Sequence, residues 1–189
     1  MSRYEIYLFL HIVCAILWIG GGTMLLIQSI RAERANDLVG MQRALATTTA
    51  MALVLFVPAS LGALVFGLLM VIDGPWSFGT AWVVLGLIGF AATFCTGLFF
   101  IKPESERLEA LVARNGGVMG PDAIAAGRRM LLISRVDFVV LYLVVADMAL
   151  KPTWRDGVLL AIMAVILVAA VGWLLMRLRA TPVAVAAAE

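Results

Sequence analysis

The chain has 189 residues, of which 63% are hydrophobic and only 14% charged, and its mean hydropathy is +1.06. A water-soluble domain is about 45–50% apolar and about 25% charged, so this composition excludes a soluble fold. The net charge of +2 is no nucleic-acid signature, and we expect no nucleic-acid partner.

Five apolar stretches follow one another along the chain, each close to the roughly 20 residues that cross a bilayer. They cover approximately residues 4–30, 47–72, 80–101, 130–150 and 158–176. The sequence therefore predicts an all-α, polytopic bundle of five transmembrane helices, embedded in a lipid bilayer. We expect one domain over residues 1–179 and a disordered tail at 180–189.

The Lys and Arg residues are distributed unevenly between the predicted loops. Ten of the fourteen lie in the loops before the second and fourth stretches or in the C-terminal tail, whereas three lie on the opposite side. Loops rich in Lys and Arg remain in the cytoplasm. The bias therefore predicts an N-terminus outside and a cytoplasmic C-terminus.

The first stretch contains the only histidine of the chain, His11, on a helical face that continues through Cys14, Trp18 and Gly22. An ionisable group in hydrocarbon indicates a functional site, and imidazole is a ligand of haem iron. The glycines at 20–22 leave space for a flat macrocycle. Copper binding by His11 and Cys14 is a weaker alternative, as are a proton relay and a packing role.

The second and third stretches contain features of closely packed helices. Pro58 lies in the middle of the second and predicts a kink. Small residues recur at helical spacing, which allows close approach, at Ala59, Ala63 and Gly67 and again at Gly89, Thr93 and Gly97. We expect these two helices to pack together, within one chain or across a dimer. The loop after them predicts a short helix over 103–112, in a cytoplasmic hairpin that either rests on the headgroups or forms a surface for docking a partner.

The fourth stretch contains most of the intramembrane charge. Arg135 is expected to reach the cytoplasmic headgroups, and Asp137 to face the bundle interior or water. Asp147 is expected either to pair with Lys151 four residues later or to hydrogen-bond the imidazole of His11. Met148 is the candidate for a second iron ligand, by its depth alone. The fifth stretch has no internal charge and predicts a peripheral helix.

Residues 11–21, HIVCAILWIGG, resemble the H-x-x-x-A-x-x-W-x-G-G opening of two small bacterial membrane families, the copper-resistance D-type proteins and the membrane protoporphyrinogen oxidases. In those families this histidine is implicated in haem binding. Over nearly its whole length the chain is similar to the predicted integral membrane proteins of domain of unknown function 2269. The stretches that carry this likeness are PASLG at 58–62, RVD at 135–137 and VADMALKP at 145–152.

The resemblance implies a multi-pass protein of the bacterial inner membrane and favours haem b on His11. One histidine per chain means that a bis-histidine site needs a homodimer. A small transporter or ion conductor that uses His11, Asp137 and Asp147 is the second hypothesis, and a structural or assembly subunit of a membrane complex is the third. The sequence has no flavin or nicotinamide motif, and it indicates no catalytic residue.

Overall fold

The computed structural model describes residues 2–180, and within that range it consists of helices and short connections without a strand. The all-α prediction is therefore confirmed. Four helical rods of the described chain are long and apolar enough to cross a membrane. The tail expected to be disordered lies, from residue 181 onward, outside the described residues.

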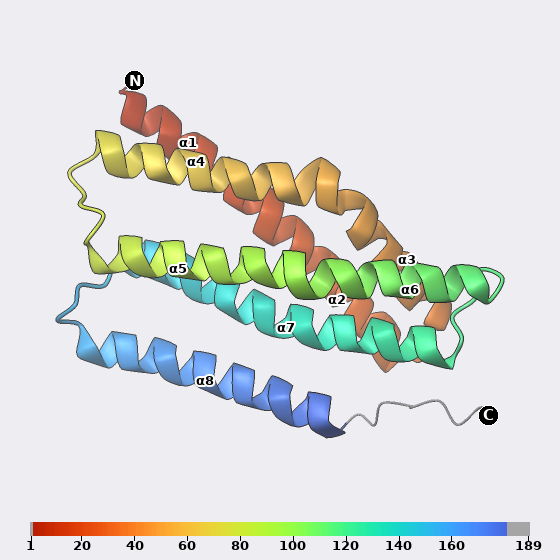
Figure 1. Ribbon diagram of the computed structural model, residues 1–189. Helices are drawn as coiled ribbons and strands as arrows, with labels where there is room; N and C mark the ends of the chain where they lie inside the picture. The colour runs from red at the N-terminus through yellow and green to blue at the C-terminus, as the bar shows by residue number, and fades with distance from the viewer. Residues whose placement is uncertain (1, 181–189) are drawn as a thin grey trace.

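Three of the rods are interrupted by a π-helical segment (Figure 1). The first consists of α1 (Arg3–Ala15), η1 (Ile16–Gly20) and α2 (Gly21–Arg34). The second consists of α3 (Leu38–Met51), η2 (Ala52–Phe56) and α4 (Val57–Asp73). The third consists of α5 (Ala81–Thr96), η3 (Gly97–Ile101) and α6 (Lys102–Arg114). Two uninterrupted helices follow, α7 (Pro121–Leu150) and α8 (Gly157–Ala180).

The helix α7 contains the fourth predicted span, 130–150, and it is the least apolar of the long helices. With 30 residues and a rise of about 1.5 Å per residue, it is about 45 Å long, enough to cross a bilayer. Its charged residues set it apart from the four rods that are both long and apolar. The count of five spans and their orientation remain predictions.

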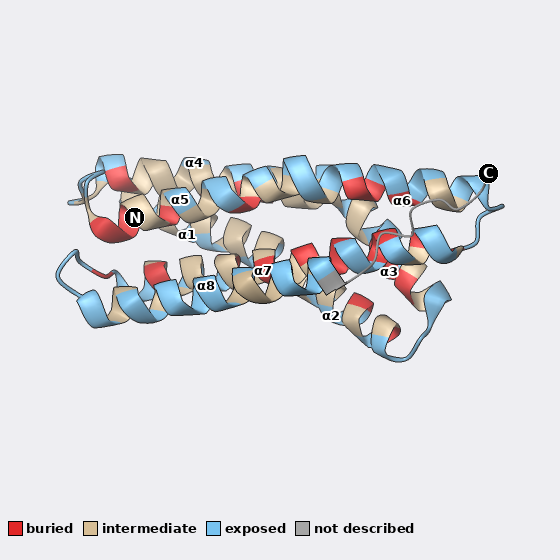
Figure 2. Ribbon diagram, turned by 60° about the horizontal axis from the view of Figure 1, so that its bottom comes forward, coloured by how far each residue is buried: buried red, intermediate tan, exposed pale blue. Residues whose placement is uncertain are grey.

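The helices run roughly alongside one another, with α8 at one edge (Figure 1). The helix α1 packs against α4 and α2 against α3, while α5 and α6 both pack against α7. The helix α8 packs against α7, and none of residues 157–179 is buried (Figure 2). This placement agrees with the expectation of a peripheral fifth helix.

A bend separates α3 from α4 (Figure 1), and η2 lies at that point. Pro58 is the second residue of α4. Proline has no backbone N–H to donate to the preceding turn, and a π-helical segment is one of the known causes of a kink. The kink predicted from Pro58 is thus formed by the proline together with η2.

We call the end of the bundle that holds α6 and the first turns of α7 the α6 end, and the end with Trp76 and Asp73 the Trp76 end. The largest buried apolar cluster lies at the α6 end, where it includes Met41, Leu108 and Met130. The interrupted rods have 32, 36 and 34 residues, so they are about 48–54 Å long and exceed a hydrocarbon layer of about 30 Å. Outside that layer, water drives apolar side chains together.

The short helix predicted over 103–112 is confirmed as α6, and its position at the headgroups remains a prediction. The helix α6 continues the direction of α5 through η3, and it packs against α7.

The small-residue faces find partners other than the expected ones. A side chain at Gly67 of α4 would meet His11 of α1, and one at Gly89 of α5 would meet Val144 of α7. Small residues allow close approach of any helix that lies opposite, and the spacing does not specify which one. The expected pairing of the second and third spans is wrong within this chain.

Candidate functional site

His11 lies in α1, with its Nδ1 2.7 Å from the carbonyl oxygen of Ala63 in α4. A carbonyl oxygen only accepts hydrogen bonds, so Nδ1 carries the proton and donates it. In the neutral imidazole, Nε2 is then the nitrogen with the free lone pair. The ring lies close to the α4 backbone because Gly67 is small: a Cβ at that position would be 3.2 Å from both Nδ1 and Cε1.

Cys14, one turn later, also faces α4. Its sulfur would be 2.7 Å from a Cβ at Gly62, so the thiol lies in the contact between the two helices. Among the described residues no group of three or more His, Cys, Asp or Glu side chains could hold a metal ion. Copper binding by His11 and Cys14 therefore has no third ligand from these residue types within the described chain.

Of the glycines at 20–22, only Gly20 has the open space that a macrocycle needs. A Cβ at Gly22 would be 2.6 Å from the ring of Phe138 in α7, while Gly20 has no atom within 4 Å of its Cβ position. Trp18 contacts Phe90 of α5 edge to face, with ring centroids 5.8 Å apart. Aromatic rings thus fill the inner side of this segment, and only Gly20 faces open space.

Asp147 lies in the last turn of α7, where its side chain is 1% exposed and neither carboxylate oxygen has a hydrogen-bond partner. The expected ion pair with Lys151 is not formed. The Lys151 ammonium instead lies over the rings of Trp76 and Trp82, 4.7 and 5.5 Å from their centroids. No hydrogen bond joins Asp147 to His11 in the described chain, and that pairing remains a prediction.

Met148 lies against α5 rather than near the histidine. Its methyl carbon would be 2.1 Å from a Cβ at Gly86, and the side chain packs on the cluster around Trp82. His11 belongs to the contact between α1 and α4, and Met148 to the contact between α5 and α7. The role of Met148 as a second iron ligand also remains a prediction.

Toward the α6 end, Arg135 pairs with Glu33 of α2. The two side chains are 25% and 20% exposed, and the expected reach of Arg135 to the headgroups remains a prediction. Two residues further on, Oδ1 of Asp137 is buried without a partner, as the prediction of an inward-facing carboxyl implies. The sequence offered no signal for Glu33, because it lies in a mixed run of charges at the end of α2.

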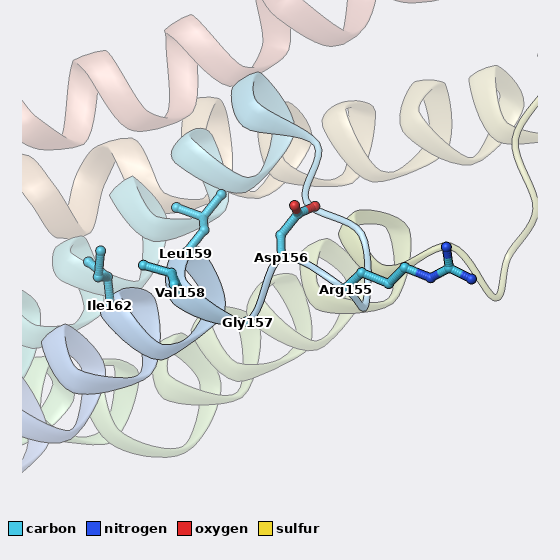
Figure 3. A pocket seen from close by; sticks show the side chains of 6 residues that line it. All are labelled: Arg155, Asp156, Gly157, Val158, Leu159 and Ile162. Atoms are coloured by element: carbon cyan, nitrogen blue, oxygen red, sulfur yellow. The ribbon is translucent and has the colours of Figure 1, made fainter.

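A shallow open hollow of about 420 Å³ lies where α7 connects to α8. Figure 3 shows Arg155 extending away from the apolar side chains that line it, Val158, Leu159 and Ile162. The backbone N–H and the hydroxyl of Thr153 donate to Asp156 beside it, which lowers the pKa of that carboxyl. The polar groups are satisfied locally, and none converges on the hollow.

No curated protein and no solved structure matches this chain. The family described as predicted integral membrane protein (DUF2269) matches residues 5–152, from the first turn of α1 to the residue after Lys151. The match includes His11, Asp137 and Asp147 and stops before α8. The chain therefore belongs to the DUF2269 family of predicted integral membrane proteins.

Proposed function

We propose that this protein is a multi-pass protein of the bacterial inner membrane that binds haem b through Nε2 of His11. The hydrogen bond from Nδ1 to the Ala63 carbonyl carries the proposal. A metal-ligating histidine usually donates its other ring N–H to a carbonyl or carboxylate, which fixes the tautomer and the ring orientation. The bonded ring of His11 meets this requirement. When bound, haem b would supply one-electron transfer.

A haem held by two histidines requires a second copy of this chain. Phe138 fills the space at Gly22, so the described chain offers no cradle for a macrocycle beside that glycine. Each chain has a single histidine. Two copies of His11 in a homodimer would each supply an imidazole nitrogen to the iron, and this arrangement would need neither Met148 nor Asp147.

An absorption spectrum of the detergent-purified protein tests this proposal. We expect a Soret band and a reduced-minus-oxidised α band, both lost or shifted in His11→Ala. The matched control is Tyr142→Phe, since it removes the 2.8 Å hydrogen bond to Thr23 and no iron ligand. A wild-type protein that stays colourless after reconstitution with haemin would contradict haem binding.

The same hydrogen bond favours a structural role as the alternative, with His11 fastening α1 to α4. Under that role, His11→Ala lowers only the stability, by about 0.6 kcal/mol, the average for an intramembrane hydrogen bond.

The unpaired buried oxygens of Asp137 and Asp147 favour a third function, the conduction of protons or cations along α7. Flux into proteoliposomes that falls in Asp137→Asn would support it, and a spectrum without haem bands would then be expected.

A further inference from the structure

The Trp76 end of the bundle contains an unusual concentration of buried polar atoms without partners. Both carboxylate oxygens of Asp147 and the Nε1 atoms of Trp76 and Trp82 are buried and form no hydrogen bond. A buried carboxylate without a donor is costly, and such groups in folded proteins nearly always have a partner. The Asp147 side chain therefore lacks a hydrogen-bond donor among the described residues as they are arranged here.

The indoles of Trp76 and Trp82 form a surface suited to a cation, and Asp147 Oδ2 lies 3.6 Å from the Cβ position of Gly86, one helical turn after Trp82. The ring centroids of the two indoles are 5.2 Å apart and their planes are at 86°. Tryptophan faces bind ammonium groups within about 6 Å of the ring centroid. The Lys151 ammonium occupies this position, 4.7 Å from one centroid and 5.5 Å from the other. The chain thus shows directly that an alkylammonium is accommodated here.

Asp147 and Lys151 are one turn apart but are not paired, because the helix ends between them. Lys151 adopts a left-handed backbone conformation, with φ 47° and ψ 57°, and the next residue, Pro152, is buried. This turn carries the Lys151 side chain toward the indoles and away from the carboxylate. Lys151 is exposed, whereas Asp147 and Trp82 are buried.

We propose that Asp147, Trp76 and Trp82 form a binding site for a primary alkylammonium group. A ligand ammonium would lie against the indoles but nearer to Asp147 than the Lys151 ammonium does, and would donate a hydrogen bond to the carboxylate. Lys151 occupies the indole part of the site when no ligand is present. A carboxylate disfavours anions, and the described chain has no third His, Cys, Asp or Glu ligand here for a metal ion. An organic ammonium needs only one acceptor and an aromatic surface.

The ammonium has two chemical sources, a small free amine and the ethanolamine headgroup of a phospholipid. Trp76 lies in the connection between α4 and α5, where tryptophan typically lies at the membrane interface. A headgroup would arrive from the bilayer and a free amine from water. The two sources share the same recognition by Asp147, and the experiment separates them.

Titration of the full chain in dodecyl maltoside with ethylammonium chloride tests the site, with tryptophan fluorescence and calorimetry as readouts. We expect a saturable signal that sodium chloride at equal ionic strength does not produce. Asp147→Asn should weaken binding at least tenfold, because the amide loses the negative charge. Glu104→Gln is the matched control, a buried carboxyl at the α6 end with an oxygen that forms no hydrogen bond, and should bind as the wild type does.

Lys151→Met gives the sharper test, because it removes the internal competitor and keeps a side chain of similar length on the same backbone. Binding should tighten at least threefold in this variant. Weaker binding in Lys151→Met, or equal binding in Asp147→Asn, would overturn the site. Should Asp147→Asn fail to fold, Lys151→Met alone decides.

The second arm adds phosphatidylethanolamine, phosphatidylcholine or phosphatidylglycerol to the micelles. A saturable response to phosphatidylethanolamine, but not to phosphatidylcholine or phosphatidylglycerol, assigns the site to a headgroup whether or not ethylammonium also binds. A response to ethylammonium without one to phosphatidylethanolamine assigns it to a free amine. No response to either probe, in both the wild type and Lys151→Met, refutes the proposal.

Discussion

Gly67→Ala tests whether the imidazole of His11 is held where the structure places it. The new methyl group would lie 3.2 Å from Nδ1 and Cε1, and no other atom outside the helix backbone lies within 4 Å of it. Carbon contacts are most favourable at about 3.5–4.0 Å. The ring must therefore move by a few tenths of an ångström, which strains its 2.7 Å hydrogen bond to Ala63.

The magnitude follows from three terms. Crowding a packed contact costs about 1–3 kcal/mol, and a weakened intramembrane hydrogen bond costs up to about 0.6 kcal/mol. Replacing glycine by alanine inside a helix contributes about 1 kcal/mol in the opposite direction. Gly67→Ala should therefore lower the free energy of unfolding by about 1–2 kcal/mol in the wild-type background.

In the His11→Ala background the same substitution should raise stability by about 1 kcal/mol, since no ring remains to be displaced. The coupling energy between the two positions is then about 2–3 kcal/mol, within the range for residues in direct contact. Unfolding in detergent micelles, followed by circular dichroism, measures all four members of the cycle. Gly172→Ala in α8, which has no atom within 4 Å, gives the propensity term alone. Additive effects of the two substitutions would refute the contact.

Three further predictions concern the rest of the bundle. In a background without native cysteines, Thr80→Cys should react with an impermeant thiol reagent in intact cells and Asn115→Cys should not; the reverse result would invert the topology. Gly89→Leu should destabilise the bundle by several kcal/mol, because a Cβ there lies 2.3 Å from Val144. Ala164→Leu on α8 should have almost no effect on stability, and equal unfolding midpoints for the two variants would contradict the packing. Asn36 has φ 51°, so Asn36→Ala should cost about 1 kcal/mol and Asn36→Gly close to nothing; equal losses in thermal unfolding would argue against the left-handed turn.

The helices of this fold were predictable because the membrane makes length and hydropathy decisive. An apolar stretch of about 20 residues has few alternatives to a helix in hydrocarbon, where every backbone N–H must be bonded internally. Residue types typical of helix ends are found at two of the boundaries. Asp37 caps α3 by accepting from the N–H of Gly40, and Gly116 and Gly117, both with positive φ, follow the end of α6.

The pairing of the helices was not predictable, and neither were the partners of the polar residues. A small-residue face indicates that another helix packs closely against it, but does not identify that helix. The prediction therefore paired Gly67 with the wrong helix of the chain. The acceptor for His11 is the backbone carbonyl of Ala63. Every residue has such a carbonyl, so the sequence does not identify which one accepts. The pairing of Arg135 with Glu33 joins residues about a hundred positions apart, a contact that depends on how α2 lies against α7.

The order of the helices from centre to edge follows from the charges they carry. The helix α7, with Arg135, Asp137 and Asp147, contacts α2, α3, α5, α6 and α8. The helix α8 has the highest window hydropathy, 2.9, and nothing buried within that window. In water the most apolar helix would be the most buried, but lipid solvates apolar side chains and excludes charges. The least apolar helix therefore takes the centre, where α5 and α2 shield the carboxyl groups of Asp137 and Asp147 and the Arg135 guanidinium from hydrocarbon. Function that depends on these groups, whether conduction along α7 or ammonium binding at its end, is for the same reason confined to the interior of the bundle.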